Sequence, residues 1–403
     1  MIERKETLED LINFKDKNLI KVVTGIRRCG KSTLFELFQN YLMDHGVIEE
    51  QIITVNLEDG DYRDIRTSKT LYEYVESKLL KDKKNYVFLD EVQLINNFQE
   101  GVDWLYAKKN VDLYITGSNA FLLSGELATL LSGRYVEIKM QPLSFKEYVS
   151  AYPNDTNISA LYMNYLQNSS FPGTLELIRK KDIRIYLEGI YNTILLKDIV
   201  TRKKIADPAM LQSVVEFVFD NIGNMCSSTK IANSMTSSGR KISVPTVESY
   251  LSALADSFIV YKVGRYDIKG KQHLATGSKY YVADIGLRYF LLGTRHTDRG
   301  HILENIVYLE LLRRGYEVYV GKVGDAEVDF IAINADGETY YQVSQTVMEE
   351  QTLKRELASL DAIKDHNPKY LLTMDFTPVT SYNGIKQINV LQWLMKRGDA
   401  HEA

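Results

Sequence analysis

The chain has 403 residues, a hydrophobic fraction of 45%, a charged fraction of 25% and a formal net charge of −4. These values are typical of folded globular proteins and argue against a disordered chain; the length predicts about two to four domains. The negative net charge excludes a uniformly basic nucleic-acid-binding protein, so any contact with DNA would have to use local basic patches.

The apolar runs, the N-terminal residues and the cysteines indicate where in the cell the protein is expected. No run approaches the about 18 apolar residues of a membrane helix, and the charged start, residues 1–6, lacks the apolar core of a signal peptide. The two cysteines, Cys29 and Cys226, lie far apart, which makes a disulfide framework implausible. We therefore expect a cytoplasmic protein without a membrane segment.

The first motif follows an apolar run at residues 19–23 that predicts a buried strand, and the sequence from Thr33 predicts a helix. Between them the chain reads Gly25-Ile26-Arg27-Arg28-Cys29-Gly30-Lys31-Ser32. A G-x-x-x-x-G-K-[ST] loop between a strand and a helix is typical of nucleoside triphosphate binding, because backbone N–H groups and the helix N-terminus hold phosphate oxygens. We expect residues 25–33 to bind ATP, with Lys31 at the β- and γ-phosphates and Ser32 on Mg²⁺.

The second motif is acidic and follows an apolar run at residues 86–89, which predicts a buried parallel strand. Asp90 and Glu91 follow it directly. Ligands of open α/β sheets bind at the carboxyl ends of the strands. We expect Asp90 to support Mg²⁺ through water and Glu91 to orient and polarise the attacking water. Two solvated acids at a strand end are the alternative, which the complete phosphate loop disfavours.

A third strand is expected over residues 111–116, followed by Gly117, Ser118 and Asn119. A polar side chain at this strand end can contact the γ-phosphate or the lytic water, and Asn119 is the first candidate and Ser118 the second. The same three residues are also typical of a plain β-turn. Spacing alone leaves both interpretations open.

Arg134 lies between a short helix ending at Gly133 and a strand beginning near Tyr135. An arginine at such a junction can act as a finger that stabilises charge on the phosphoryl group of a neighbouring subunit's nucleotide. That role would require a homo-oligomer. The alternative, which the sequence leaves equally open, is an arginine that binds the carbonyl groups at the end of its own helix.

The middle of the chain, residues 151–205, is expected to be helical, with an apolar stripe over residues 186–200. Basic residues crowd around this stripe, and they are Arg179, Lys180, Lys181, Arg184, Lys197, Arg202, Lys203 and Lys204. A solvated helix face is the usual explanation of such a run, and a regulatory or nucleic-acid-binding surface is the alternative.

Residues 209–295 predict a winged helix. After a helix at 210–221, two short helices near 228–235 and 243–254 are joined by a Gly-containing turn; Ser243 can cap the second and Pro245 suits its first turn. Strands at 261–266 and 279–283 then enclose an expected basic loop, residues 267–278. The second short helix carries no Arg or Lys, so base-specific readout from it is disfavoured.

The basic residues of the expected wing suit contact with DNA phosphates, and they are Lys262, Arg265, Lys269, Lys271 and Lys279. Winged helices also act as spacers or as protein-binding surfaces. The sequence leaves DNA contact and these alternatives open.

The last quarter predicts a helix at 302–314 and strands at 316–320, 326–333 and 339–344. It resembles the restriction-endonuclease-like core, in which a helix Glu, a strand Asp and a Glu-x-Lys motif collect Mg²⁺. Glu304 and Asp329 match the first two positions, whereas Gln342-Val-Ser344 departs from the third. Gln is a weaker Mg²⁺ ligand and Ser lacks the ammonium group, so we expect this module to be inactive as a nuclease. A small α/β module without nuclease ancestry is the alternative.

The motifs together resemble the prokaryotic AAA+-like P-loop ATPases, and more narrowly a family that pairs the ATPase with a C-terminal DUF4143 region. The resemblance extends over essentially the whole chain. It rests on the phosphate loop and on the runs at 89–93, 116–119, 131–134 and 142–148. This chain departs from the family pattern at one turn. Similar proteins often have the sequence Gly-Gly-aromatic-Pro there, whereas this chain has Ser169-Ser-Phe-Pro172.

We thus expect an α/β protein with an AAA+-like P-loop parallel sheet sandwiched by helices. The expected domains are an ATPase core (1–150), a helical extension (151–208), a winged helix (209–295) and an inactive nuclease-like module (296–403). The expected function is Mg²⁺-dependent ATP hydrolysis coupled to DNA or another macromolecular partner. A nucleotide-dependent protein-binding switch in signalling or defence, without DNA binding, is the alternative.

Overall fold

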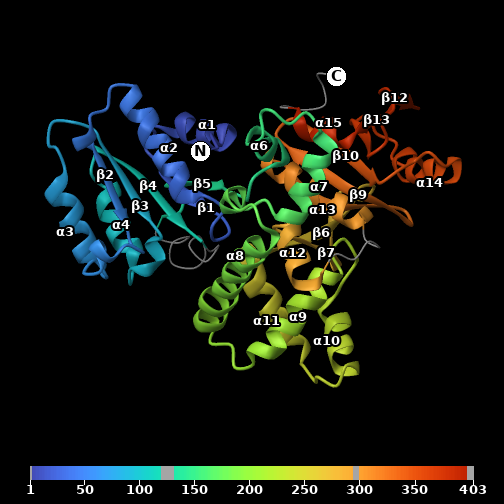
Figure 1. The fold of residues 1–403 in the computed structure, drawn as a ribbon, viewed down its shortest axis with the longest axis horizontal. Coiled ribbons are helices and arrows are strands. Elements are labelled where there is room, and N and C mark those ends of the chain that lie inside the picture. The colour runs from blue at the N-terminus through green and yellow to red at the C-terminus, as the bar shows by residue number, and fades with distance from the viewer. Residues whose placement is uncertain (1, 119–130, 294–298, 397–403) are drawn as a thin grey trace. The chain divides into compact units, whose positions relative to one another are not determined.

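The computed structural model describes residues 2–118, 131–293 and 299–396 (Figure 1). The chain forms two compact units, one of residues 1–142 with Asp256–Phe258, the other of residues 143–255 with 259–403. Within the described residues, no helix combines the length and the apolar character needed to cross a membrane.

The first unit is built on a five-stranded sheet. Its strands are β1 (Ile20–Thr24), β2 (Ile52–Asn56), β3 (Asn85–Asp90), β4 (Val111–Gly117) and β5 (Tyr135–Lys139). Neighbours pair in the order β2-β3-β4-β1-β5, and every pairing is parallel. The expected α/β fold with a parallel central sheet is confirmed. Because the strands are parallel, β1, β3 and β4 end at one edge, where the phosphate loop and both acids lie.

Helices cover both faces of this sheet (Figure 1). They are α1 (Lys5–Phe14), α2 (Lys31–Asp44), α3 (Ser68–Lys78) and α4 (Phe98–Tyr106), with short 3₁₀ turns η1 (Glu49–Gln51), η2 (Gly60–Tyr62) and η3 (Val92–Leu94). Side chains alternate along each strand. Val87 and Leu89 therefore share a core with Leu71 of α3, whereas the Phe88 ring packs edge-on against Phe35 of α2, with centroids 5.1 Å apart.

The second unit begins with the expected helical segment. Its first helices are α6 (Phe145–Ser150), α7 (Ile158–Asn168), α8 (Lys180–Asn192), α9 (Pro208–Asp220), α10 (Ser228–Ser237), α11 (Val244–Asp256) and α12 (Ile285–Leu292), with a 3₁₀ turn η5 (Pro172–Glu176) and a π-helix η6 (Thr193–Thr201). The Ser243 hydroxyl accepts the Thr246 N–H at 3.2 Å, as expected of an N-cap.

An eight-stranded sheet completes this unit, in the order β12-β13-β11-β10-β9-β8-β6-β7. Its strands are β6 (Val260–Asp267), β7 (Gln272–Val282), β8 (Glu317–Val323), β9 (Ala326–Asn334), β10 (Gly337–Ser344), β11 (Lys369–Thr373), β12 (Thr380–Tyr382) and β13 (Ile385–Asn389). The accompanying helices are α13 (Arg299–Arg313), α14 (Glu350–Asp361) and α15 (Val390–Met395).

The sheet shows that the prediction of a basic loop over residues 267–278 is wrong. β7 begins at Gln272, because residues from there onward pair with β6, as in Leu274 opposite Arg265. Only a tight turn remains between the two strands. The other edge of β6 pairs in parallel with β8, so that the hairpin expected as a wing belongs to the same sheet as the strands of the expected C-terminal module.

The unusual turn at residues 169–172 lies against the start of α12. Ser169 is fully buried with φ +76° and ψ 156°, a backbone region that strongly favours glycine. The N–H and hydroxyl of Ser170 both donate to Asp284 Oδ2, at 2.7 and 2.6 Å. The departure at residue 169 therefore places a serine where the backbone conformation favours glycine.

Gly286 of α12 allows this close approach, and its replacement by alanine tests the packing. A Cβ there would lie 2.4 Å from Ser169 Cα. We expect Gly286→Ala to lower the free energy of unfolding by about 3 kcal/mol, because backbone must move. Gly189→Ala is the control in a helix, since a Cβ there meets nothing within 4 Å. It should stabilise by about 0.5–1 kcal/mol. Equal effects in denaturant unfolding would contradict the packing described here.

Candidate nucleotide-binding site

The phosphate loop, residues 25–30, connects β1 to α2 at the carboxyl edge of the first sheet. Gly25 has φ +154°, and a Cβ there would lie 2.0 Å from the Met140 carbonyl oxygen, so that only glycine fits. Gly30, with φ +104°, directly precedes α2. Ile26 and Cys29 are fully buried beneath the loop. The loop is thus held in a curled form by its own packing, which is the form that phosphate binding requires.

Ser32, Asp90 and Thr116 meet at this edge. The Ser32 hydroxyl donates to Asp90 Oδ2 at 2.5 Å, and the Thr116 hydroxyl donates to Asp90 Oδ1. Burial raises the pKa of Asp90 although both hydrogen bonds act to lower it, and the Glu91 charge raises it further. A buried carboxylate beside a serine hydroxyl is a donor set that suits a hard divalent cation, because the cation would offset the cost of the buried charge.

Lys31 lies on the inner side of the loop. Its Nζ donates to the carbonyl oxygens of Gly25 at 3.1 Å and Ile26 at 3.3 Å. It also lies 3.7 Å from Glu91 Oε1. The ammonium group is therefore held between the loop and the acidic strand end, within reach of any group that the loop binds.

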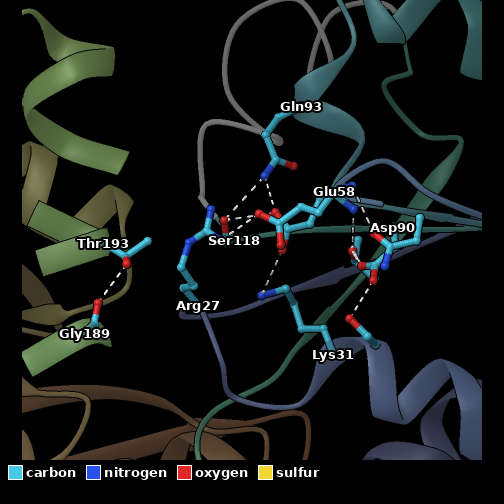
Figure 2. A network of polar contacts seen from close by, with 12 residues as sticks. Arg27, Lys31, Glu58, Asp90, Gln93, Ser118, Gly189 and Thr193 are labelled. Atoms are coloured by element: carbon cyan, nitrogen blue, oxygen red, sulfur yellow. Dashed lines mark hydrogen bonds and ion pairs between the residues drawn. The ribbon is translucent and has the colours of Figure 1, made fainter. Parts of the chain in front are cut away.

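The Glu91 carboxylate is held on its other oxygen. Ser118 Oγ donates to Glu91 Oε2 at 3.1 Å, and the Gln93 side-chain amide donates to the same oxygen. The Glu91 backbone has φ +55°, and its N–H donates to Thr116 Oγ1 at 3.0 Å. Figure 2 shows Lys31, Asp90, Gln93 and Ser118 around this network. The arrangement holds the Glu91 carboxylate beside the Lys31 ammonium group.

Two of these residues were not expected from the sequence. Gln93 follows Glu91 by two residues on η3, and Thr116 is the penultimate residue of β4. The available signals were a polar side chain directly after the acidic pair and a hydroxyl at the end of a buried strand. Neither signal identifies a hydrogen-bond partner by itself.

The remaining loop residues have other contacts. Arg27 Nη1 donates to Glu58 Oε1 at 2.8 Å (Figure 2). Arg28 has φ +68° and is exposed. Cys29 Sγ lies 3.6 Å from the Met140 carbonyl oxygen, and burial raises the pKa of this thiol. Cys29 is thus kept protonated and packs the loop from below.

Asn119 and Arg134 are the two remaining catalytic candidates. Asn119 lies outside the described residues. Arg134 directly precedes β5, and the parallel pairing of Ile20 with Tyr135 puts it at the amino edge of the sheet, opposite the phosphate loop. Its Nη1 lies 2.6 Å from Asp103 Oδ1, and both side chains are well exposed. The structure brings together Lys31, Ser32, Asp90, Glu91 and Ser118, and it does not bring Arg134 to them.

No group of three or more His, Cys, Asp or Glu side chains is arranged to hold a metal ion anywhere in the described part of the chain. A metal ion at Ser32 and Asp90 would need further oxygen ligands, which phosphate oxygens and water can supply.

The class of protein follows from this geometry and from family comparison. A family model described as "AAA domain" matches residues 17–149, the stretch that contains the loop, both acids and the parallel sheet. The first unit is thus an AAA-type P-loop domain, and its family consists of nucleotide-binding ATPases. A second model, "Domain of unknown function (DUF8612)", matches residues 159–298. The expected DUF4143 region is not confirmed.

Two curated relatives define the family more narrowly. The chain is 40% identical over 400 residues to an uncharacterized protein of Haemophilus influenzae, covering 98% of this chain and 99% of that one. It is 31% identical over 372 residues to an uncharacterized protein of Methanocaldococcus jannaschii, covering 87% of this chain and 80% of that one. The chain therefore belongs to the family of these uncharacterized proteins.

A solved structure shares the fold. The Walker-type ATPase of Pyrococcus abyssi superposes with a TM-score of 0.50 at 17% identity, over 72% of this chain and 96% of that chain. At this identity the likeness shows the fold alone.

Within the described part of the chain, the polar side-chain contact that the structure gives Arg134 is the ion pair with Asp103 and not the alternative cap of its own helix, and the finger role can be separated from this ion pair. If Arg134 serves the nucleotide of a neighbouring subunit, Arg134→Ala should lower ATP turnover by about 10³-fold and leave ATP binding intact. Asp103→Ala removes the same exposed ion pair, which contributes at most about 1 kcal/mol, and should keep turnover. Equal, small effects of both substitutions on steady-state phosphate release would assign Arg134 to the ion pair alone.

Proposed function

We propose that this protein binds ATP with Mg²⁺ at the phosphate loop and hydrolyses it. The observation that carries the proposal is the contact between Ser32 and Asp90, made directly beside Lys31 and Glu91. A phosphate loop alone supports nucleotide binding. A cation site next to an oriented carboxylate adds the two components that hydrolysis needs, charge neutralisation and a positioned water.

The phosphate loop and the end of β3 have separate roles in nucleotide binding. Backbone N–H groups of residues 25–33 hold the phosphates, aided by the N-terminus of α2. Lys31 exchanges its contacts with the Gly25 and Ile26 carbonyls for the β- and γ-phosphate oxygens. Ser32 and Asp90 would hold Mg²⁺, and the ion would supply charge neutralisation at the phosphates.

Glu91 activates the attacking water. When Lys31 turns to the phosphates, Glu91 Oε1 loses its ammonium partner and can accept a hydrogen bond from water. Ser118 and Gln93 hold Oε2, so the carboxylate stays in place. The water oxygen forms a bond to the γ-phosphorus, the bond from the γ-phosphorus to the bridging oxygen breaks, and the proton of water passes to Glu91.

Two substitutions separate binding from hydrolysis. We expect Lys31→Ala to weaken ATP binding at least tenfold. The substitution removes the ammonium group that lies between Glu91 and the carbonyl groups of Gly25 and Ile26. Glu91→Gln should bind ATP as the wild type does and lose at least 10²-fold in turnover, because the amide cannot accept the proton. Fluorescent-nucleotide titration and phosphate release measure the two quantities. Full turnover by Glu91→Gln would refute this role of Glu91.

We further propose that ATP turnover is coupled to DNA through the hairpin of β6 and β7. Lys262, Lys269 and Lys271 are exposed there. Two hydrogen bonds stabilise the turn, because Asp267 Oδ1 accepts the N–H groups of Lys269 and Gly270, both at 3.1 Å. Two exposed ammonium groups on a short, ordered turn suit contact with the phosphates of a nucleic acid.

Salt dependence tests this coupling. The affinity for DNA falls as salt rises, and each lysine–phosphate contact contributes about 0.9 to the magnitude of the slope of log affinity against log salt. Lys269→Ala/Lys271→Ala should therefore reduce the magnitude of this slope for duplex DNA by about two. Lys81→Ala/Lys83→Ala removes two exposed charges from the other unit and should leave the slope unchanged. Binding is measured by fluorescence anisotropy at several salt concentrations, and turnover with and without DNA.

The alternative function, a nucleotide-dependent switch that binds a protein partner, predicts the opposite result. In that case duplex and single-stranded DNA would neither bind at low salt nor change ATP turnover of the wild type. The net charge of −4 and the absence of Arg and Lys from α11 favour this alternative over base-specific DNA recognition.

A further inference from the structure

The second unit buries one ammonium group among three carboxylates. Lys279 of β7 places Nζ 2.8 Å from Glu304 Oε1 of α13, 2.8 Å from Glu327 Oε1 and 4.0 Å from Asp329 Oδ1, the last two on β9. The Lys279 side chain is 5% exposed and that of Glu304 8%, whereas Glu327 is 40% exposed. The four residues, called the Lys279 cluster below, thus form a buried ion cluster that reaches the surface at Glu327.

The ammonium group offsets the cost of burying the acids. Isolated carboxylates are expensive to remove from water, and a cation in contact with them recovers much of that cost. The cluster receives two more hydrogen bonds, from the Tyr281 hydroxyl to Glu304 and from the Val343 N–H to Asp329 Oδ2 at 2.8 Å. Burial acts to lower the pKa of Lys279, but Glu304, Asp329 and Glu327 outweigh it and raise this pKa. Lys279 therefore stays charged.

The spacing of the carboxylates fits an ammonium group. Contacts of 2.8 Å are the length of charge-assisted N–H···O hydrogen bonds, whereas oxygen ligands lie about 2.0–2.1 Å from Mg²⁺. The neighbouring Gln342 is also committed elsewhere, because its Nε2 donates to Glu356 at 2.9 Å and its Oε1 accepts the Asp329 N–H at 3.3 Å.

We propose that the Lys279 ammonium group permanently occupies the cation position between Glu304, Glu327 and Asp329, so that this unit carries a built-in cation and takes up no divalent metal there. The cluster is then a fixed structural centre that joins β7, α13 and β9. The proposal concerns the second unit alone and stands or falls independently of ATP hydrolysis. It has a direct consequence: removal of the ammonium group leaves three carboxylates around a vacated cation position that is open to solvent at Glu327.

The test compares wild type with Lys279→Ala, using Mn²⁺ as the probe and no nucleotide. Both proteins also carry Asp90→Asn, which removes the acid of the phosphate-loop site. In this comparison, wild type therefore means wild type at residue 279. We expect the Lys279→Ala protein to unfold at a temperature several degrees lower, and Mn²⁺ to restore most of the loss. Mn²⁺ binding, followed by electron paramagnetic resonance, should be at least tenfold tighter than in the wild type.

A second substitution controls for charge. Lys279→Ala/Glu304→Gln removes one carboxylate together with the ammonium group and should be more stable than Lys279→Ala alone, with little response to Mn²⁺. If Lys279→Ala fails to fold, refolding it with and without Mn²⁺ decides: recovery only with Mn²⁺ supports the proposal, and no recovery overturns it. The proposal is also overturned if Lys279→Ala equals the wild type in stability, or if the wild type binds Mn²⁺ or cleaves DNA in a way that Asp329→Asn abolishes.

Discussion

The contact between the Ser32 hydroxyl and Asp90 is the constraint on which the candidate site depends. It joins the first turn of α2 to the end of β3, and the Thr116 hydroxyl extends the connection to β4. Three elements from separate parts of the chain are thereby fixed at one edge of the sheet. Lys31 and Glu91, the immediate neighbours of Ser32 and Asp90, are placed beside each other as a consequence. Hydroxyl donors cannot remove the cost of burying Asp90, which explains why its pKa stays raised.

The ATPase core could be predicted because its signals are local. The phosphate loop contains its own strand, turn and helix, and the acids follow an apolar run directly, so a parallel sheet places them at one edge by geometry alone. The positions of Gln93, Thr116 and Arg134 depend on strand order and register, which a local pattern does not reveal. The pairing of β5 with β1 decides that Arg134 lies at the opposite edge from Lys31.

The second unit was harder to predict because its contacts join distant segments. The first strand of the expected wing, β6, pairs with β8, about fifty residues further along the chain, and neither stretch of sequence shows this pairing. In the sequence Lys279 is one of several basic residues, and nothing near it indicates that its carboxylate partners come from α13 and β9. Ser169 shows the same limit, since only the structure reveals that its backbone adopts a conformation favouring glycine. In each case a residue's role is set by contacts with segments that are distant in the sequence.

Hydrolysis of Mg²⁺-bound ATP at the Ser32–Asp90 contact is the central claim. Single-turnover conversion of bound ATP to ADP and phosphate, in wild type and Ser32→Ala, with Mg²⁺ and with a chelator, tests it most directly. The account predicts conversion by the wild type only with Mg²⁺, and at least 10²-fold slower conversion by Ser32→Ala with ATP still bound. Equal rates with and without Mg²⁺, or an unchanged rate in Ser32→Ala, would contradict it.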